Sequence, residues 1–248
     1  MEEWIVVLLA VGLLVAAFGY AAVGHGGASA YIAAMALAGI APAEMRPIAL
    51  LLNILVSSLG TLKFHRAGFF RWRLFWPFAV VSIPMAYLGG AITLPGNAYK
   101  ILVGVVLLYA AWQLWRSGKS GEEMREVREP PLGWAMLIGA AMGLLAGLTG
   151  VGGGIFLSPL LLMLGWAGTK QTSAVAAPFI LVNSLAGLAA VFVAKGVALP
   201  GYVWILAPAV LVGGWLGAEY GSRRFANPLV RRVLAVVLAL AGAKMNSV

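Results

Sequence analysis

The chain lacks cysteine and aspartate altogether, and only two of its 248 residues are histidine, His25 and His65. Without cysteine it can form neither a disulfide nor a thiolate metal site. Enzyme active sites usually need a nucleophile beside a base, a metal cluster or paired carboxylates. Because the sequence offers none of these, we expect no enzymatic activity, no bound metal and no cofactor.

Charge is also scarce, since only 10% of the residues are charged while 62% are hydrophobic. Soluble domains carry about 25% charged residues, and the mean hydropathy here is +0.96. The longest polar stretch covers only residues 116–131. The composition therefore predicts a polytopic protein of the lipid bilayer. The net charge of +9 falls in short segments between apolar runs, which is how membrane orientation is encoded, so nucleic acid is not an expected partner.

The fold class that we predict is all-α. With about 20 residues for a full span, helical segments are predicted at 4–23, 28–40, 46–65, 73–94, 97–116, 132–149, 154–167, 171–194, 199–220 and 227–244. The first follows two glutamates rather than a basic region, so we interpret it as a retained helix. Segments 28–40 and 154–167 each reach only about 20 Å and resemble half-helices.

The two halves of the chain are similar to each other. Each has about five predicted segments, and the matching residues share nearly one offset: Gly24, Gly26 and Gly27 with Gly150, Gly152 and Gly153, Gly39 with Gly165, Gly68 with Gly196, and Tyr87-Leu88-Gly89 with Trp215-Leu216-Gly217. We therefore predict an N-terminal membrane repeat (1–116), a cytoplasmic linker (117–131) and a C-terminal membrane repeat (132–248).

Basic residues predict the orientation. They crowd the segments 63–73, 116–128 and 223–232, which we expect on the cytoplasmic side of the cell (inner) membrane. The basic stretch 63–73 precedes the fourth predicted helix of the first half, whereas 223–232 follows the fourth predicted helix of the second half. The repeats are thus predicted to have inverted topology, with both termini external.

The glycine-rich breaks, Gly24–Gly27 and Gly150–Gly154, each precede a predicted half-helix. The first turn of a helix has unpaired N–H groups and the positive end of the helix dipole, so each break can bind an anion without any charged side chain. Inverted repeats would bring both breaks together at the membrane midplane. The alternative is that the glycines serve tight packing. We favour binding for Gly24, Gly26, Gly27, Gly150, Gly152, Gly153 and Gly154, and packing for Gly12, Gly19, Gly139, Gly143 and Gly147.

Several polar side chains are further candidates. His25 lies within the first break and could carry a coupling proton, or could simply bond a backbone carbonyl. Arg46 could attract anions, but we favour the alternative that it pairs with Glu44 and extends toward the headgroups. The corresponding segment of the second half begins with three polar residues that could bind oxyanion oxygens or cap the helix: Gln171, Thr172 and Ser173. Three residues deeper in the predicted helices are second-tier candidates for binding: Asn53, Ser57 and Asn183.

The stretch GLLAGLTGVGGGIFLSP at 143–159 resembles the G-x-x-x-G-x-x-G-x-G-G-G-x-x-x-x-P signature of the sulfite exporter TauE/SafE family, and Thr172-Ser173 is similar to that family's polar pair. The resemblance covers nearly the whole chain. The first half matches more loosely, with Ala33 at the place of Pro159. It implies transport of small sulfur oxyanions or organosulfonates, such as sulfite or sulfoacetate.

We therefore expect a transporter of a small sulfur-containing anion that works by alternating access around the two glycine breaks, with a proton as candidate coupling ion. The alternatives are a passive anion channel, a transporter of another small anion such as a carboxylate, and an assembly subunit without transport of its own.

Overall fold

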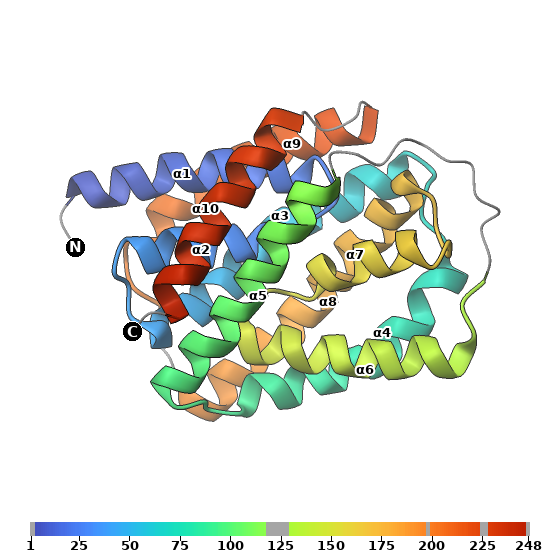
Figure 1. The fold of residues 1–248 in the computed structure, drawn as a ribbon, viewed down its shortest axis with the longest axis horizontal. Coiled ribbons are helices and arrows are strands. Elements are labelled where there is room, and N and C mark those ends of the chain that lie inside the picture. Colours follow the sequence, from blue (N-terminus) through green and yellow to red (C-terminus); the bar gives the residue numbers. More distant parts are fainter. Residues whose placement is uncertain (1–2, 118–128, 197–198, 224–227, 247–248) are drawn as a thin grey trace.

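The computed structural model describes residues 3–117, 129–196, 199–223 and 228–246, and this part of the chain is helical with no strand (Figure 1). Its ten helices are α1 (Glu3–Ala21), α2 (Ala28–Leu37), α3 (Pro42–Arg66), α4 (Trp72–Ala91), α5 (Gly96–Ser117), α6 (Leu132–Thr149), α7 (Gly154–Met163), α8 (Thr169–Lys195), α9 (Val203–Arg223) and α10 (Pro228–Asn246). The predicted all-α fold class is confirmed.

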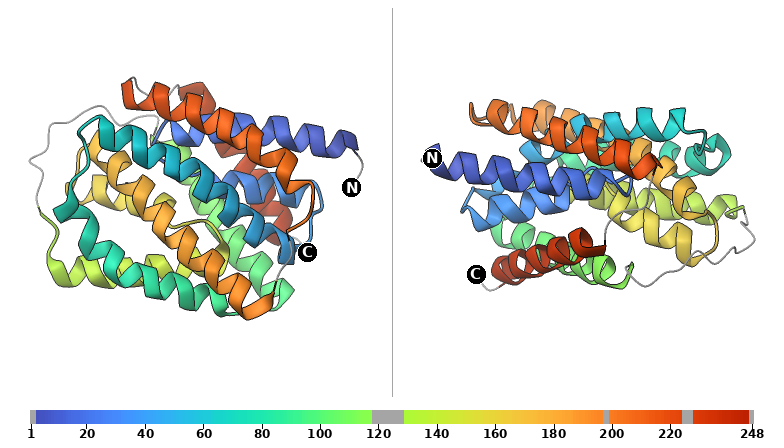
Figure 2. Two further views of the ribbon diagram at one scale, coloured as in Figure 1. Left: turned by 180° about the vertical axis from the view of Figure 1, so that it is seen from behind. Right: turned by 90° about the horizontal axis from the view of Figure 1, so that it is seen from above.

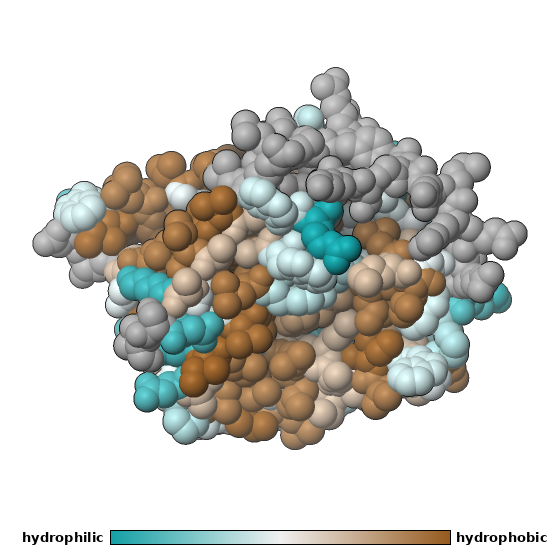
Figure 3. Space-filling view, viewed as in Figure 1, coloured by the Kyte–Doolittle hydropathy of each residue, from teal (hydrophilic) through white to brown (hydrophobic). Residues whose placement is uncertain are grey.

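Six of the described helices are long and apolar enough to cross a membrane: α1, α3, α4, α6, α8 and α9. Helices α2 and α7 have only ten residues each, as the sequence predicts for half-helices. Large apolar side chains such as Leu8, Leu137 and Val193 are more than half exposed, and hydrophobic residues cover much of one face of the molecule (Figure 3). Such a surface needs lipid around it, so this is a multi-pass membrane protein.

The charged ends of the helices differ from the prediction. Helix α3 begins at Pro42 rather than at residue 46, because proline suits the first helical position and Glu44 complements the dipole in the first turn. It also continues through Lys63 to Arg66, so the expected basic loop 63–73 is two helix ends joined by residues 67–71. Residues 231 and 232 likewise lie within α10. Most of the predicted linker, 118–128, lies outside the described residues.

Glycines at every fourth position bring two pairs of helices into close contact. Those of α6 lie against the backbone of α4, and those of α9 lie against α1 and the residue that follows it, so that an added Cβ would overlap a backbone oxygen. The contacting residues are Gly139, Gly143 and Gly147 with Phe78, Ser82 and Ala86, and Gly213, Gly217 and Gly221 with Leu14, Phe18 and Ala22. The packing role expected for the α6 glycines therefore holds. It does not explain Gly12, where no atom lies within 4 Å of the Cβ position.

The central helices α3 and α8 run antiparallel, because Asn53 pairs with Ser184 while Gly60 lies beside Ala177. Helix α2 begins beside Asn53 and returns to the start of α3, and α7 begins beside Ile180 and returns to the start of α8. The two half-helices therefore run from the middle of the molecule toward opposite ends. The N-terminal end of α1 and the C-terminal end of α10 lie at the same end of the molecule (Figure 2).

Candidate functional site

Both glycine breaks are buried, and two matched pairs of their glycines share a positive φ, whereas Gly152 has φ 79° and its match Gly26 does not have a positive value. Gly27 precedes α2 with φ 96° and Gly153 precedes α7 with φ 81°, and the matching Gly24 and Gly150 have φ 75° and 83°. Such positive values favour glycine strongly over other residues. We call residues 22–27 the first tip and residues 150–153 the second tip.

The two tips meet at one side chain of α3. The Asn53 Oδ1 atom accepts a hydrogen bond from the Ala28 N–H at 3.2 Å, and its Nδ2 donates to the Val151 carbonyl at 3.2 Å and to Ser184 Oγ at 3.3 Å. A Cβ atom at Gly26 or Gly152 would lie less than 3.0 Å from the Asn53 amide, and 3.1 or 2.9 Å from the Ile180 Cγ2. Asn53 and Ile180 thus fill the space between the tips.

The carbonyl groups of the tips have donors from the surrounding protein. Ser173 Oγ donates to the Val23 carbonyl at 2.9 Å, and the Tyr31 hydroxyl donates to the Gly26 carbonyl at 2.7 Å. In the second tip region the Tyr99 hydroxyl donates to the Thr149 carbonyl at 3.1 Å. The negative ends of these peptide groups therefore bond to the protein.

The N–H groups at the tips are different, because many of them find no acceptor in the part of the chain that the structure describes. They belong to Gly26, Gly27, Ser29 and Ala30, and to Gly152, Gly153, Gly154 and Ile155. Every helix leaves its first N–H groups unpaired, but water normally satisfies them. All these residues are buried, and buried N–H groups without a partner are rare in proteins. The tips therefore present donors and the positive ends of two helix dipoles.

Arg46 also lies beside the second tip, and the interpretation that we favoured for it is wrong. Its side chain is only 4% exposed, and its guanidinium donates to the Gly89 carbonyl at 2.6 Å and the Ile92 carbonyl at 3.0 Å, at the end of α4. Its Cγ atom lies 3.2 Å from the Cβ position of Gly150. The expected partner, Glu44, instead accepts a hydrogen bond from the Tyr202 hydroxyl at 2.8 Å. The carbonyl groups at the end of α4 stabilise this buried cation, and its Nε–H has no partner within the described residues.

The polar residues at the start of α8 separate into different roles. Ser173 takes the place beside Gly24 that Arg46 takes beside Gly150, and its hydroxyl bonds the first tip. The Gln171 side chain accepts from the Gly168 N–H at 3.3 Å and caps the helix. The Thr172 hydroxyl is buried without a partner among the described residues. Of these three side chains, Thr172 therefore has hydrogen-bonding capacity left for a ligand.

The second-tier candidates differ in their contacts. Asn53 contacts both tips, whereas Ser57 donates to the Asn53 carbonyl and Asn183 to the Phe179 carbonyl, both within their own helices. The sequence reasoning missed Ile180, Tyr31 and Tyr99 as tip residues, and it missed Ser158, whose buried hydroxyl has no described partner. Among these four residues only Tyr31 had a local signal in the sequence, because it follows Gly26 of the first tip by five residues.

His25 lies half-buried at the first tip. Its Nδ1 atom is 3.0 Å from the Val23 carbonyl, and its ring meets the edge of Tyr20 at 6.3 Å between centroids. This hydrogen bond is the one expected if His25 simply bonds a backbone carbonyl, and it holds the ring in place at the tip.

Comparisons with known proteins place the chain in a family. The model of the family described as "Sulfite exporter TauE/SafE" matches residues 8–245. The chain is 41% identical over 241 residues to the "Probable membrane transporter protein y4hK" of Sinorhizobium fredii (strain NBRC 101917 / NGR234), covering 96% of both chains. It is 27% identical over 201 residues to the "Probable membrane transporter protein ORF9" of Sinorhizobium sp, covering 80% of this chain and 75% of that protein. No solved structure matches. The chain therefore belongs to the sulfite exporter TauE/SafE family and is a membrane transporter, not an enzyme.

Proposed function

We propose that this transporter carries a small sulfur-containing anion, sulfite or an organosulfonate, and binds it between the two glycine tips. The observation that carries the proposal is the set of buried N–H groups that face the middle of the molecule without an acceptor. The oxygen atoms of a sulfite or sulfonate group accept several hydrogen bonds at once. The dipoles of α2 and α7 and the buried charge of Arg46 favour a negative ligand at the same place.

The arrangement of the helices supports alternating access by two inverted repeats. Helices α2 and α7 approach the centre from opposite ends, and α4 packs on α6 as α9 packs on α1. Because Asn53 and Ile180 occupy the space between the tips, an anion enters only when these side chains move apart. We infer that rocking of one repeat against the other opens this centre to each side in turn.

The substrate is tested by thermal shift of the purified protein with sulfite, thiosulfate, sulfate, sulfoacetate, taurine and acetate. A ligand of the folded state raises the melting temperature, and at one hundred times its Kd it stabilises by about 2.7 kcal/mol. We expect a shift with sulfite or sulfoacetate. A shift with acetate alone would indicate a carboxylate transporter. Accumulation of the anion against its gradient separates a coupled transporter from a passive channel.

Inverted topology is tested by accessibility of introduced cysteines, since the natural chain has none. Ala67 follows α3 and Gly201 precedes α9, both exposed, and the hydrogen bond between Glu44 and Tyr202 places Gly201 at the other end of α3 from Ala67. We expect a membrane-impermeant maleimide to label Ala67→Cys only from the cytoplasm and Gly201→Cys only from outside. The unaltered chain is the control, and labelling of both positions from one side would refute inversion.

His25 is the candidate site of a coupling proton, because imidazole is the side-chain group whose ordinary pKa lies between about pH 5 and 8. A protonated imidazole would strengthen anion binding, so uptake by the wild type should rise as the pH falls from about 8 to 5. We expect His25→Ala to flatten this profile. The control is His65→Ala, which alters the other histidine, at the end of α3 beside Phe70. A His25→Ala profile that follows the wild type would exclude this role.

A further inference from the structure

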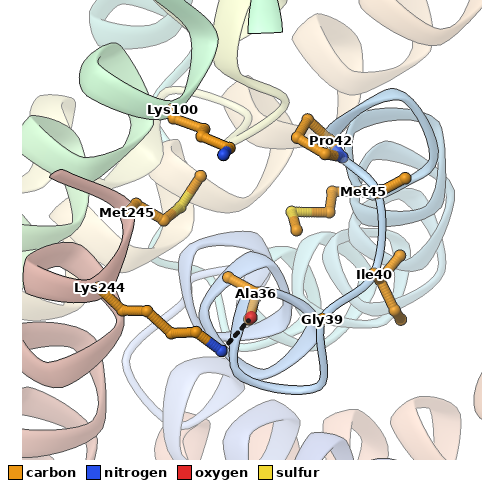
Figure 4. A pocket seen from close by; sticks show the side chains of 9 residues that line it. Ala36, Gly39, Ile40, Pro42, Met45, Lys100, Lys244 and Met245 are labelled. Atoms are coloured by element: carbon orange, nitrogen blue, oxygen red, sulfur yellow. Dashed lines mark hydrogen bonds between the residues drawn. The ribbon is translucent and has the colours of Figure 1, made fainter. Parts of the chain in front are cut away.

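A cavity of about 220 Å³ lies away from the tips, at the end of the molecule where α2 joins α3 (Figure 4). Its walls are the α2–α3 connection, the first turn of α3, the start of α5 and the end of α10. Most of the lining is apolar, including Pro42, Met45 and Met245. The two exceptions are Lys100 of α5 and Lys244 of α10.

Lys244 is held at the wall of this cavity. Its ammonium donates to the Ala36 carbonyl at 3.1 Å and the Leu37 carbonyl at 3.2 Å, in the last turn of α2. A lysine near a helix end usually extends toward the headgroups. Here the two carbonyl groups hold the ammonium at the last turn of α2, which fixes its charge beside the cavity (Figure 4).

Lys100 provides a second charge on the same cavity. Its side chain is half-buried and directs its ammonium toward the cavity (Figure 4). Within the described residues it has neither an ion pair nor a hydrogen bond. The acid closest in sequence to the lining, Glu44, is not part of the wall and is bonded by Tyr202. The described lining therefore carries two positive charges and no carboxylate.

We propose that this cavity is a second anion site, which takes a phosphate or sulfonate group between Lys100 and Lys244. The apolar walls lower the local dielectric and strengthen the attraction of both ammonium groups for the anion. One water molecule occupies about 30 Å³ in the liquid, so the cavity has room for such a group with a short apolar body.

The cavity is connected to the second tip through neighbouring residues of the chain, although it is a separate site. Met45 precedes Arg46, and Lys100 follows Tyr99, whose hydroxyl bonds the Thr149 carbonyl. The second tip region is thus contacted by Arg46 and Tyr99, and the residues next to them in the chain, Met45 and Lys100, line the cavity. The bound group comes either from an anionic lipid headgroup or from a free anion on its way to the tips, and the chemistry that recognises it is the same.

The test compares the purified wild type with Lys100→Gln and with the double variant Lys100→Gln/Lys244→Gln. Glutamine at position 244 keeps an N–H donor for α2. Lys170→Gln is the matched control, because it removes the same charge at the start of α8, where the ammonium lies over the Phe69 ring at 5.0 Å. One arm measures retention of phosphatidylglycerol against phosphatidylcholine by native mass spectrometry. The other measures sulfoacetate binding by calorimetry in lipid-free detergent.

We expect the wild type and Lys170→Gln to bind alike, Lys100→Gln to bind at least about tenfold more weakly, and the double variant more weakly still. A loss confined to phosphatidylglycerol identifies the lipid headgroup as the ligand, and a loss confined to sulfoacetate identifies the free anion. If the double variant binds both probes as the wild type does, or if the wild type binds neither, the site does not exist. Only the difference between variants counts, so the result is independent of binding at the tips.

Discussion

Leucine in place of Gly153 is expected to abolish anion uptake into proteoliposomes, while the purified protein keeps its helical content and its elution volume. Gly153 directly precedes α7 and has φ 81°, and its Cβ position lies 3.0 Å from the ring of Phe179. A leucine side chain there would cover the N–H groups of the second tip. Each hydrogen bond to a charged group contributes about 1.5–3 kcal/mol, so losing two of them weakens binding at least about a hundredfold.

The control for this variant is Gly68→Leu, in the connection between α3 and α4. Gly68 has φ 78° and no atom within 4 Å of its Cβ position, so leucine there brings the same backbone strain, about 1–2 kcal/mol, without a new contact. If Gly153→Leu fails to fold, Gly154→Ala replaces it, because Gly154 has no positive φ and its added Cβ would displace the Ile180 side chain, whose Cδ1 and Cγ1 atoms lie less than 3.0 Å from that position. Wild-type uptake by a folded tip variant would show that the tips do not hold the anion.

The helices could be predicted from the sequence because long apolar runs and rows of glycine are local signals. Clusters of glycine disfavour a helix, so the starts of the short helices α2 and α7 were predicted correctly from the breaks Gly24–Gly27 and Gly150–Gly154. The start of α3 was misplaced because Glu44 and Arg46 look like the polar end of a span. Proline at the first position and a capped, buried arginine make the same residues part of the helix.

The contacts within the site could not be predicted in the same way, because they join residues far apart in the chain. The partners of Arg46 are the last carbonyl groups of α4, and no sequence pattern indicates which helix end lies beside a given arginine. Asn53 joins Ala28 to Val151, which is 98 residues away from it. Its importance follows from the packing of α3 against α8, and the sequence alone made it only one of several polar residues in a helix.

Leucine in place of Asn53 is expected to stop transport and to lower the melting temperature. The two side chains are similar in size, so the change chiefly removes polar contacts. It leaves the Ala28 N–H, the Val151 carbonyl and the Ser184 hydroxyl without their partner. Each buried group that loses its partner costs about 1–3 kcal/mol. Thr61→Val on the same helix is the control, since it removes one bond to the Ser57 carbonyl away from the tips, and it should transport normally.

Aspartate at position 53 separates a structural role of this residue from a role in anion binding. Asn53→Asp keeps the oxygen that accepts from the Ala28 N–H, but it replaces the donor to the Val151 carbonyl with a negative charge between the tips. An anion bound at the tip N–H groups would be repelled. Uptake should therefore fall by much more than the loss of stability, measured as the fall in melting temperature, would explain. Transport by Asn53→Asp at the wild-type rate would mean that the anion crosses the protein elsewhere, because a carboxylate and a sulfonate cannot share this centre without a strong loss of affinity.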